Sequence, residues 1–285
     1  MRYRHFIAGA LLSFLVVSTT APKAWAITIV RDFIGGSAPV NAQGGGNLAS
    51  IFNAAADMWE HALLDSWTVK LHFGWAPLGY GILGMHSLMV QGGTPNRETE
   101  GRIYFDGDGS SPWFLDPTPA EQSEYKGYTE STRDLGGGLI NTGRIYSSPS
   151  GAAMYRIDLL TAALHEIGHS LGLSSANLSF RSDAWDGDID VSSGLDSGTT
   201  IPTISGAHLG IGTSLMYPYL SPNSRKLPSG LDILANCDIS HCAQPDLNPG
   251  YLRQVPEPGT VFLLLLALLG LVVAQKKQSS AKEAL

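Results

Sequence analysis

The sequence predicts an α/β fold in which a sheet layer precedes a long helix and a loop-rich C-terminal part. Two segments, residues 47–65 and 156–173, carry apolar residues at helical spacing. Short segments between them alternate apolar and polar residues, as half-buried strands do. The chain after residue 173 is rich in Gly, Ser and Asp and has little periodicity. This order of elements indicates one α/β domain.

The first element is NLASIFNAAADMWEHALLD, residues 47–65, where Ala and Leu recur at helical spacing. Asn47 or Ser50 would cap its start, because short polar side chains accept hydrogen bonds from the first free backbone N–H groups. The next element, WTVKLHFGW at residues 67–75, alternates Val, Leu and Phe with polar residues. We expect a half-buried strand there.

Two further strands are expected at GRIYFD, residues 101–106, and GRIYSS, residues 143–148. The chain between them, residues 106–130, is rich in Gly, Pro and Asp, so we expect a long loop. RIDLLTAALHEIGHSLGL, residues 156–173, has the clearest helical pattern of the chain. We expect this helix to open near Asp158 and to stop at Gly172.

Residues 1–26 have the pattern of a secretory signal peptide. Arg2 and Arg4 come first, a short apolar run follows, and Ala24-Trp25-Ala26 provides a cleavage site. The apolar run is too short for a transmembrane helix. The pattern therefore predicts export and an encounter with signal peptidase.

The other end, residues 255–280, has the pattern of a tail that lies in a membrane. Its apolar run, residues 261–274, stands between a Pro-Glu-Pro sequence and two lysines, Lys276 and Lys277. Lysines after an apolar run favour the cytoplasmic side, and the run is short for a permanent span. A plain C-terminal anchor is the alternative to a processed tail.

Residues 27–250 remain as one domain, long enough to bury a proper core. Removing residues 1–26 and 255–285 takes away six of the 18 Lys and Arg residues and two of the 25 Asp and Glu residues, which leaves a net charge of −11. Nucleic acid and anionic lipid attract basic surfaces, so we expect neither as a partner.

The chain has two cysteines, Cys237 and Cys242, in NCDISHC. In an exported protein this spacing predicts a disulfide that closes a small loop. His241 between them raises the alternative of a metal site, but two sulfurs and one histidine are an incomplete ligand set.

HEIGH, residues 165–169, is the segment that points to chemistry. His165 and His169 are four residues apart, so on a helix they share one face and reach the same ion. Glu166 lies about 100° around the helix, where it reaches a water held at the ion and serves as a general base. Paired imidazoles with an open water position suit Zn²⁺. The alternative is a pair of core histidines on an amphipathic helix, which would bury Glu166 at an energetic cost with no partner to offset it.

A catalytic zinc normally has three protein ligands. No glutamate occurs between Ser170 and Pro256, so a downstream glutamate ligand is excluded. The extended motif HExxHxxGxxH matches through Gly172, but Ser175 stands at its last position, and serine is a poor zinc ligand.

The chain resembles the metzincin zinc proteases in this motif and in SLMYP, residues 214–218, which looks like their Met-turn. His208 stands eight residues before Met216, and this order is similar to the leishmanolysin-like branch, in which an insertion separates the helix from the third histidine. The resemblance implies that His208 is the third ligand. Asp183, Asp186 and His241 are the rival ligands.

The same resemblance implies a twisted mixed sheet over an active-site helix, with a loop-rich C-terminal subdomain. It implies a zinc-dependent endopeptidase in which Glu166 is the general base and Met216 packs beneath the zinc. A peptide or protein substrate would bind extended along an edge strand, for which GGLINTGRIYSS, residues 137–148, is the candidate.

The tail resembles the PEP-CTERM sorting signal of Gram-negative bacteria. Val255-Pro256-Glu257-Pro258 precede an apolar run and then basic residues. The resemblance implies an exosortase-type sorting enzyme as a partner and a tail that stays in the inner membrane only transiently. The cell surface, the outer membrane and the extracellular matrix are the expected destinations.

Other interpretations stay open. Ca²⁺ is a second candidate ion, either at Asp106 and Asp108 or in DGDID, residues 186–190, although neither spacing is that of an EF-hand. The chain could be a non-catalytic surface or biofilm-matrix protein, or a metal-dependent hydrolase that acts on a non-peptide bond. His61, His72 and His86 are expected to be structural or surface histidines.

Overall fold

The structure, a computed structural model, describes residues 26–250. The expected signal peptide, apart from Ala26, and the expected tail at residues 255–280 lie outside these residues. Within residues 26–250, no helix is both long enough and apolar enough to cross a membrane.

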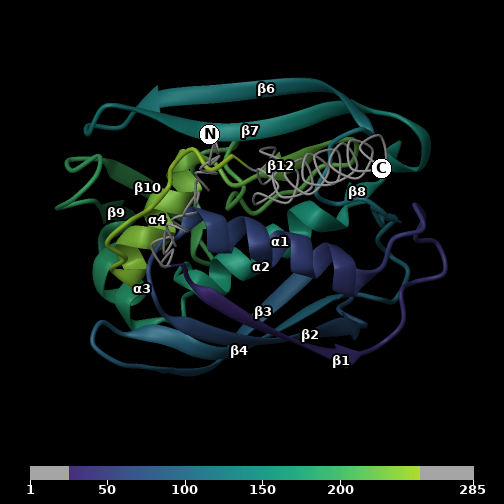
Figure 1. Cartoon of the computed structure of the whole chain (residues 1–285), viewed down its shortest axis with the longest axis horizontal. Helices are drawn as coiled ribbons and strands as arrows, with labels where there is room; N and C mark the ends of the chain where they lie inside the picture. Colours follow the sequence, from purple (N-terminus) through teal and green to yellow (C-terminus); the bar gives the residue numbers. More distant parts are fainter. Residues whose placement is uncertain (1–25, 251–285) are drawn as a thin grey trace, which may run out of the picture.

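A four-stranded mixed sheet forms the first layer (Figure 1). Its strand order is β1-β2-β4-β3; β1 and β4 run parallel to β2, and β3 runs antiparallel to β4. Strand β3 therefore lies at one edge. The strands are β1 (Thr28–Gly35), β2 (Thr68–Ala76), β3 (Gly84–Gly92) and β4 (Arg97–Asp106).

Helices α1 (Leu48–Ala62) and α2 (Leu159–Leu171) cover one face of this sheet (Figure 1). Phe52 of α1 stacks on Phe73 of β2 with ring centroids 3.9 Å apart. The indole N–H of Trp59 donates to the carbonyl of Leu164, 2.9 Å away, and ties the two helices together inside the core. Every residue of α2 is buried, so this helix lies between the sheet and the rest of the molecule.

A second, three-stranded sheet lies on the other side of the helices (Figure 1). Its order is β12-β7-β6, formed by β6 (Tyr125–Asp134), β7 (Leu139–Pro149) and β12 (Arg225–Leu227). The remaining elements are short: β5 (Trp113–Phe114), η1 (Gly151–Ala153), β8 (Ile157–Asp158), α3 (Leu178–Asp183), η2 (Ala184–Asp186), β9 (Asp188–Asp190), β10 (Thr200–Ile204), β11 (His208–Leu209) and α4 (Gly230–Ser240).

A buried ionic network fixes the start of α2. Asp158 caps the helix: its carboxylate accepts from the backbone N–H of Thr161 at 2.9 Å. The guanidinium of Arg225 contacts Asp158 at 2.8 Å and Asp116 at 2.6 Å, and all three side chains are fully buried. The network therefore joins β12, the helix cap and the segment after β5.

The two expected helices and the strand at residues 67–75 are present, with Asn47 as the cap of α1 and Gly172 at the end of α2. The expected strands at residues 101–106 and 143–148 form parts of β4 and β7. The segment at residues 106–130 is not entirely a loop, because it contains β5 and the start of β6.

The prediction that residues 137–148 form an edge strand that binds substrate is wrong. Most of it forms β7, which is the central strand of the three-stranded sheet, and both its edges are paired. Strand β3 is the edge strand beside α2 instead. Alternation of apolar and polar residues shows which face of a strand is buried, but not whether other strands pair with both its edges. The sequence pattern therefore could not distinguish a central strand from an edge strand.

Candidate metal centre

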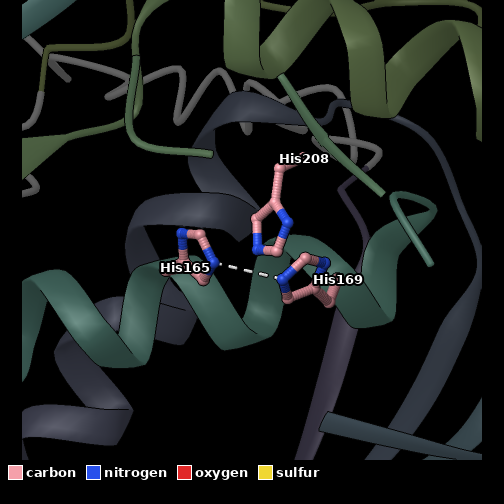
Figure 2. Close-up of side chains that lie close together, drawn as sticks. All are labelled: His165, His169 and His208. Atoms are coloured by element: carbon pink, nitrogen blue, oxygen red, sulfur yellow. Dashed lines mark hydrogen bonds between the residues drawn. The ribbon is translucent and has the colours of Figure 1, made fainter. Parts of the chain in front are cut away.

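Three imidazoles converge on one point (Figure 2). His165 and His169 lie one turn apart on α2, and their Nε2 atoms are 3.1 Å apart. His208, at the start of β11, brings its ring centroid to 5.2 Å from that of His165 and 4.9 Å from that of His169. One nitrogen of each ring lies within 4.8 Å of the other two. Within residues 26–250, this is the one group of three or more His, Cys, Asp or Glu side chains close enough to share an ion.

The outer nitrogen of each ring faces a backbone carbonyl. His165 Nδ1 lies 2.9 Å from the carbonyl oxygen of Leu215, and His208 Nδ1 lies 2.9 Å from that of Ser205. His169 Nδ1 likewise contacts the carbonyl of Leu173. A carbonyl only accepts, so each Nδ1 carries the proton, and each Nε2 is left with its lone pair for a metal.

Burial keeps these imidazoles neutral. It lowers the pKa of His169 to about 3, and it lowers the pKa of His165 well below its usual value. Burial also lowers the pKa of the half-buried His208. The neutral ring is the form that binds metal. Two acceptor nitrogens 3.1 Å apart with no proton between them repel each other, and a cation at this point would remove the repulsion. The donor set therefore fits a zinc ion.

Glu166 lies beside the three rings in the wall of a cleft of about 410 Å³. Its side chain is nearly buried, and burial raises the pKa of this carboxyl to about 8, while the backbone N–H of His86 acts in the opposite direction. The cleft is otherwise lined by apolar and small residues, among them Ile82, Ala162 and Leu220. A carboxyl with a pKa in this range is able to gain or lose a proton near neutral pH.

Met216 forms the floor beneath α2. It is fully buried, and a Cβ atom at Gly168 would lie 2.4 Å from its sulfur, so the helix needs glycine there. The backbone N–H groups of Leu215 and Met216 donate to the buried carboxylate of Asp232 at 3.1 and 2.9 Å. Because the carbonyl of Leu215 holds His165, Asp232 on α4 supports the metal site through this turn.

The rival ligands do not reach the three imidazoles. Asp183 and His241 line a separate cavity near Asn96, and neither lines the cleft. Asp186 is exposed in η2 and is absent from the cleft wall as well. Ser175, which occupies the last position of the extended motif, lines the cleft.

The two candidate calcium stretches form no close group of three donors within residues 26–250. The carboxylate of Asp106 is buried and accepts from the backbone N–H groups of Leu78 and Asp108 and from the hydroxyl of Ser110. These contacts shape a turn. The acidic side chains of residues 186–190 stay partly or fully exposed.

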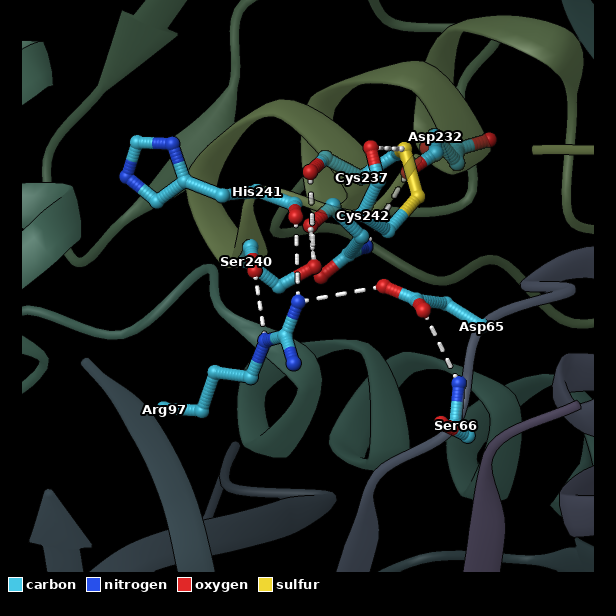
Figure 3. The surroundings of a disulfide bond; sticks show 9 residues. Asp65, Ser66, Arg97, Asp232, Cys237, Ser240, His241 and Cys242 are labelled. Carbon is cyan, nitrogen blue, oxygen red and sulfur yellow. Dashed lines mark hydrogen bonds and ion pairs between the residues drawn. A yellow bond between two sulfur atoms is a disulfide. The ribbon is translucent and has the colours of Figure 1, made fainter. Parts of the chain in front are cut away.

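The disulfide between Cys237 and Cys242 is present, as predicted (Figure 3). It closes the end of α4, where His241 takes a left-handed conformation with φ 50°. Arg97 donates to the carbonyl oxygens of Ser240 and His241 and so ties this end to β4. His241 is therefore part of a helix end and not of a metal site.

Sequence reasoning missed three residues of this site. Gly84 and His86 on β3 line the cleft next to Glu166, and Asp232 supports the turn below it. His86 was expected to be structural or on the surface; its side chain is buried and pairs with Glu98, as a structural histidine does, and it also lines the cleft. Neither β3 residue belongs to a motif, and their role depends on a strand pairing that no local pattern reveals. For Asp232 the available signal was the capping box with Ser229, which predicts only a helix start.

One family description matches the chain. Residues 254–277 match the PEP-CTERM protein-sorting motif, which confirms the expected sorting signal. The motif indicates export, cell-surface sorting in Gram-negative bacteria and recognition by an exosortase-type sorting enzyme. It says nothing about residues 26–250. No curated protein matches the chain.

Proposed function

We propose that residues 27–250 form an exported, zinc-dependent endopeptidase of the metzincin type. The observation that carries this proposal is the convergence of three neutral imidazoles, each with its Nδ1 held by a carbonyl, next to a buried glutamate in an open cleft. His165, His169 and His208 would hold the ion. When bound, zinc supplies Lewis-acid polarisation of a carbonyl group and lowers the pKa of water.

The residues of this chain supply the remaining chemistry. Glu166 takes a proton from the attacking water and returns it to the leaving amine. Its pKa of about 8 in the metal-free protein falls when a dication sits nearby, so the carboxylate is ionised in the loaded site. Residues 84–86 of the edge strand β3 line the cleft, and an extended peptide would pair with the backbone groups of this edge other than the N–H of His86, which faces Glu166.

Replacement of Glu166 by glutamine tests this proposal in the exported protein. Gln cannot accept the proton, so cleavage of fluorescently labelled casein should fall about 10²- to 10⁴-fold. Zinc content, measured by mass spectrometry, should stay at one ion per chain. Glu121→Gln, at an exposed position, is the control and should behave like the wild type.

Other results would contradict the proposal. Undiminished cleavage in Glu166→Gln would remove Glu166 from its role as proton acceptor. A wild-type protein that holds zinc but cleaves no peptide bond would favour a non-catalytic surface protein. Hydrolysis of ester or amide substrates other than peptides would favour the non-peptide hydrolase.

A further inference from the structure

The side chain of Glu166 rests directly on the backbone of β3. A Cβ atom at Gly84 would lie 2.5 Å from Oε1 of Glu166 and 2.7 Å from its Cγ, closer than atoms approach without moving. The backbone of Gly84 has no left-handed conformation that would demand glycine. Glycine is therefore required at this position because the side chain of Glu166 packs against it.

The hydrogen-bonding pattern of β3 explains which backbone groups face Glu166. The carbonyl of Leu83 accepts from the backbone N–H of Asp106 at 3.0 Å. Hydrogen-bonded and non-hydrogen-bonded pairs alternate along an antiparallel ladder. Gly84 and His86, opposite Phe105 and Ile103, therefore fall in non-hydrogen-bonded pairs. Their N–H and C=O groups point away from β4 toward the open edge, where the N–H of His86 faces the carboxyl of Glu166.

A side-chain pair links β3 to β4 at His86, whose own backbone groups point away from β4. Nε2 of His86 lies 2.9 Å from Oε1 of Glu98, and both side chains are buried. A Cβ atom at Gly101 of β4 would lie 2.0 Å from Oε1 of Glu98, so a second glycine leaves room for this pair. The ring of His86 also lies nearly parallel to that of His169, with centroids 6.4 Å apart.

We propose that His86 and Glu98 are a positioning pair that holds residues 84–86 of β3 against the carboxyl of Glu166. One part of this inference rests on the proposed function, namely that the contact aligns Glu166 for proton transfer. The contact itself is a property of the fold and can be measured without catalysis.

Two glycine variants of the same strand test the contact. Gly84→Ala displaces the carboxyl of Glu166, and a misplacement of about 1 Å costs about hundredfold in rate. We expect kcat on labelled casein to fall by about that factor, with KM within about twofold of the wild type and one zinc per chain. Gly92→Ala is the matched control, because a Cβ atom there meets nothing within 4 Å.

Two variants of Glu98 test the pair. Glu98→Leu removes the partner of His86 and should lower kcat with little change in KM or zinc content. Glu98→Gln offers both a donor and an acceptor, so it retains the bond and should restore kcat to near the wild-type value. A role limited to general stability would not separate the two variants in kcat at a temperature where both are folded.

Hydrogen exchange at the His86 amide reads the contact directly. This N–H has no partner in the ladder, so its protection should depend on Glu166. We expect exchange about tenfold faster in Glu166→Ala and in Glu98→Leu than in the wild type, and unchanged in Glu98→Gln. If these rates shift while the wild type cleaves nothing, the proposed function fails and the positioning pair stands. If exchange at His86 is the same in all variants, the positioning pair is refuted, whatever the activity.

Discussion

His165 and His169 lie on a helix that is buried along its whole length, whereas His208 lies on a two-residue strand and is half-buried. The helix is capped by Asp158, and this cap is clamped by the buried Arg225. His208 follows Ala207, which has φ 61°, and is held by the short pairing of β10 with β11.

The metal ligands are therefore positioned in two different ways. A helix fixes the spacing of two ligands through its own backbone, so the pair should keep its geometry without a metal. The third ligand comes from a loop whose position depends on tertiary contacts: the backbone N–H of Leu209 donates to the carbonyl of Met216 at 3.0 Å, and Asp232 holds the turn at Leu215 and Met216. The first prediction below acts on the helix and its cap, and the second acts on the turn that contacts both His165 and the strand of His208.

The largest effect is expected on the helix side, from Arg225→Met. This change leaves Asp158 and Asp116 buried without their cation, and breaking a buried ion pair costs about 3–5 kcal/mol. Thermal unfolding should show a loss of stability of that size. Arg133→Met, at an exposed position on β6, is the control and should change stability little.

An unchanged melting temperature in Arg225→Met would show that the network does not hold the helix cap. Loss of zinc at a temperature where the variant is still folded would show that the cap also controls the geometry of the histidine pair.

A smaller effect on stability is expected on the loop side, from Asp232→Asn. The carboxylate accepts from the backbone N–H groups of Leu215, Met216 and Ser229 and from the Ser229 hydroxyl. Asn offers one acceptor oxygen and turns an NH₂ group toward the other donors, which costs about 1–3 kcal/mol. Zinc affinity should fall about 10- to 100-fold, as it does when contacts that orient metal ligands are lost.

Asp238→Asn is the matched control on the same helix. Burial and the charges of Asp183 and Asp190 raise the pKa of Asp238 to about 6, so removal of its charge should leave stability equal or higher. Zinc affinity should not change. An Asp232→Asn variant that binds zinc as tightly as the wild type would show that the turn does not support the metal site.

The same difference explains what the sequence could predict. The positions of His165 and His169 depend on neighbouring sequence. The HEIGH motif, the helix cap at Asp158 and the helix end at Gly172 all lie within residues 158–172. His208 was predicted only from a family resemblance, namely its place before a segment that looks like a Met-turn. No local sequence pattern around His208 predicts where its side chain lies. The fold brings it to the helix across residues 172–207, which contain only the short elements α3, η2, β9 and β10 and have no periodicity in sequence.

Strands β1, β3 and β6 were not predicted, for related reasons. β3 exposes Met85, Met89 and Val90 at an open edge, so its apolar residues do not alternate cleanly with polar ones. β6 is almost wholly exposed and polar and is fixed by its pairing with β7. Edge strands bury little surface, and a pattern built on burial does not find them.

A zinc titration of the metal-free protein tests the central claim most directly, with wild type beside His208→Ala and His61→Ala. The wild type and the exposed His61→Ala should bind one zinc per chain with equal affinity. His208→Ala should lose at least about hundredfold in affinity, because it removes a ligand and not merely a contact that orients one. A His208→Ala protein that binds one zinc as tightly as the wild type would contradict the three-imidazole site.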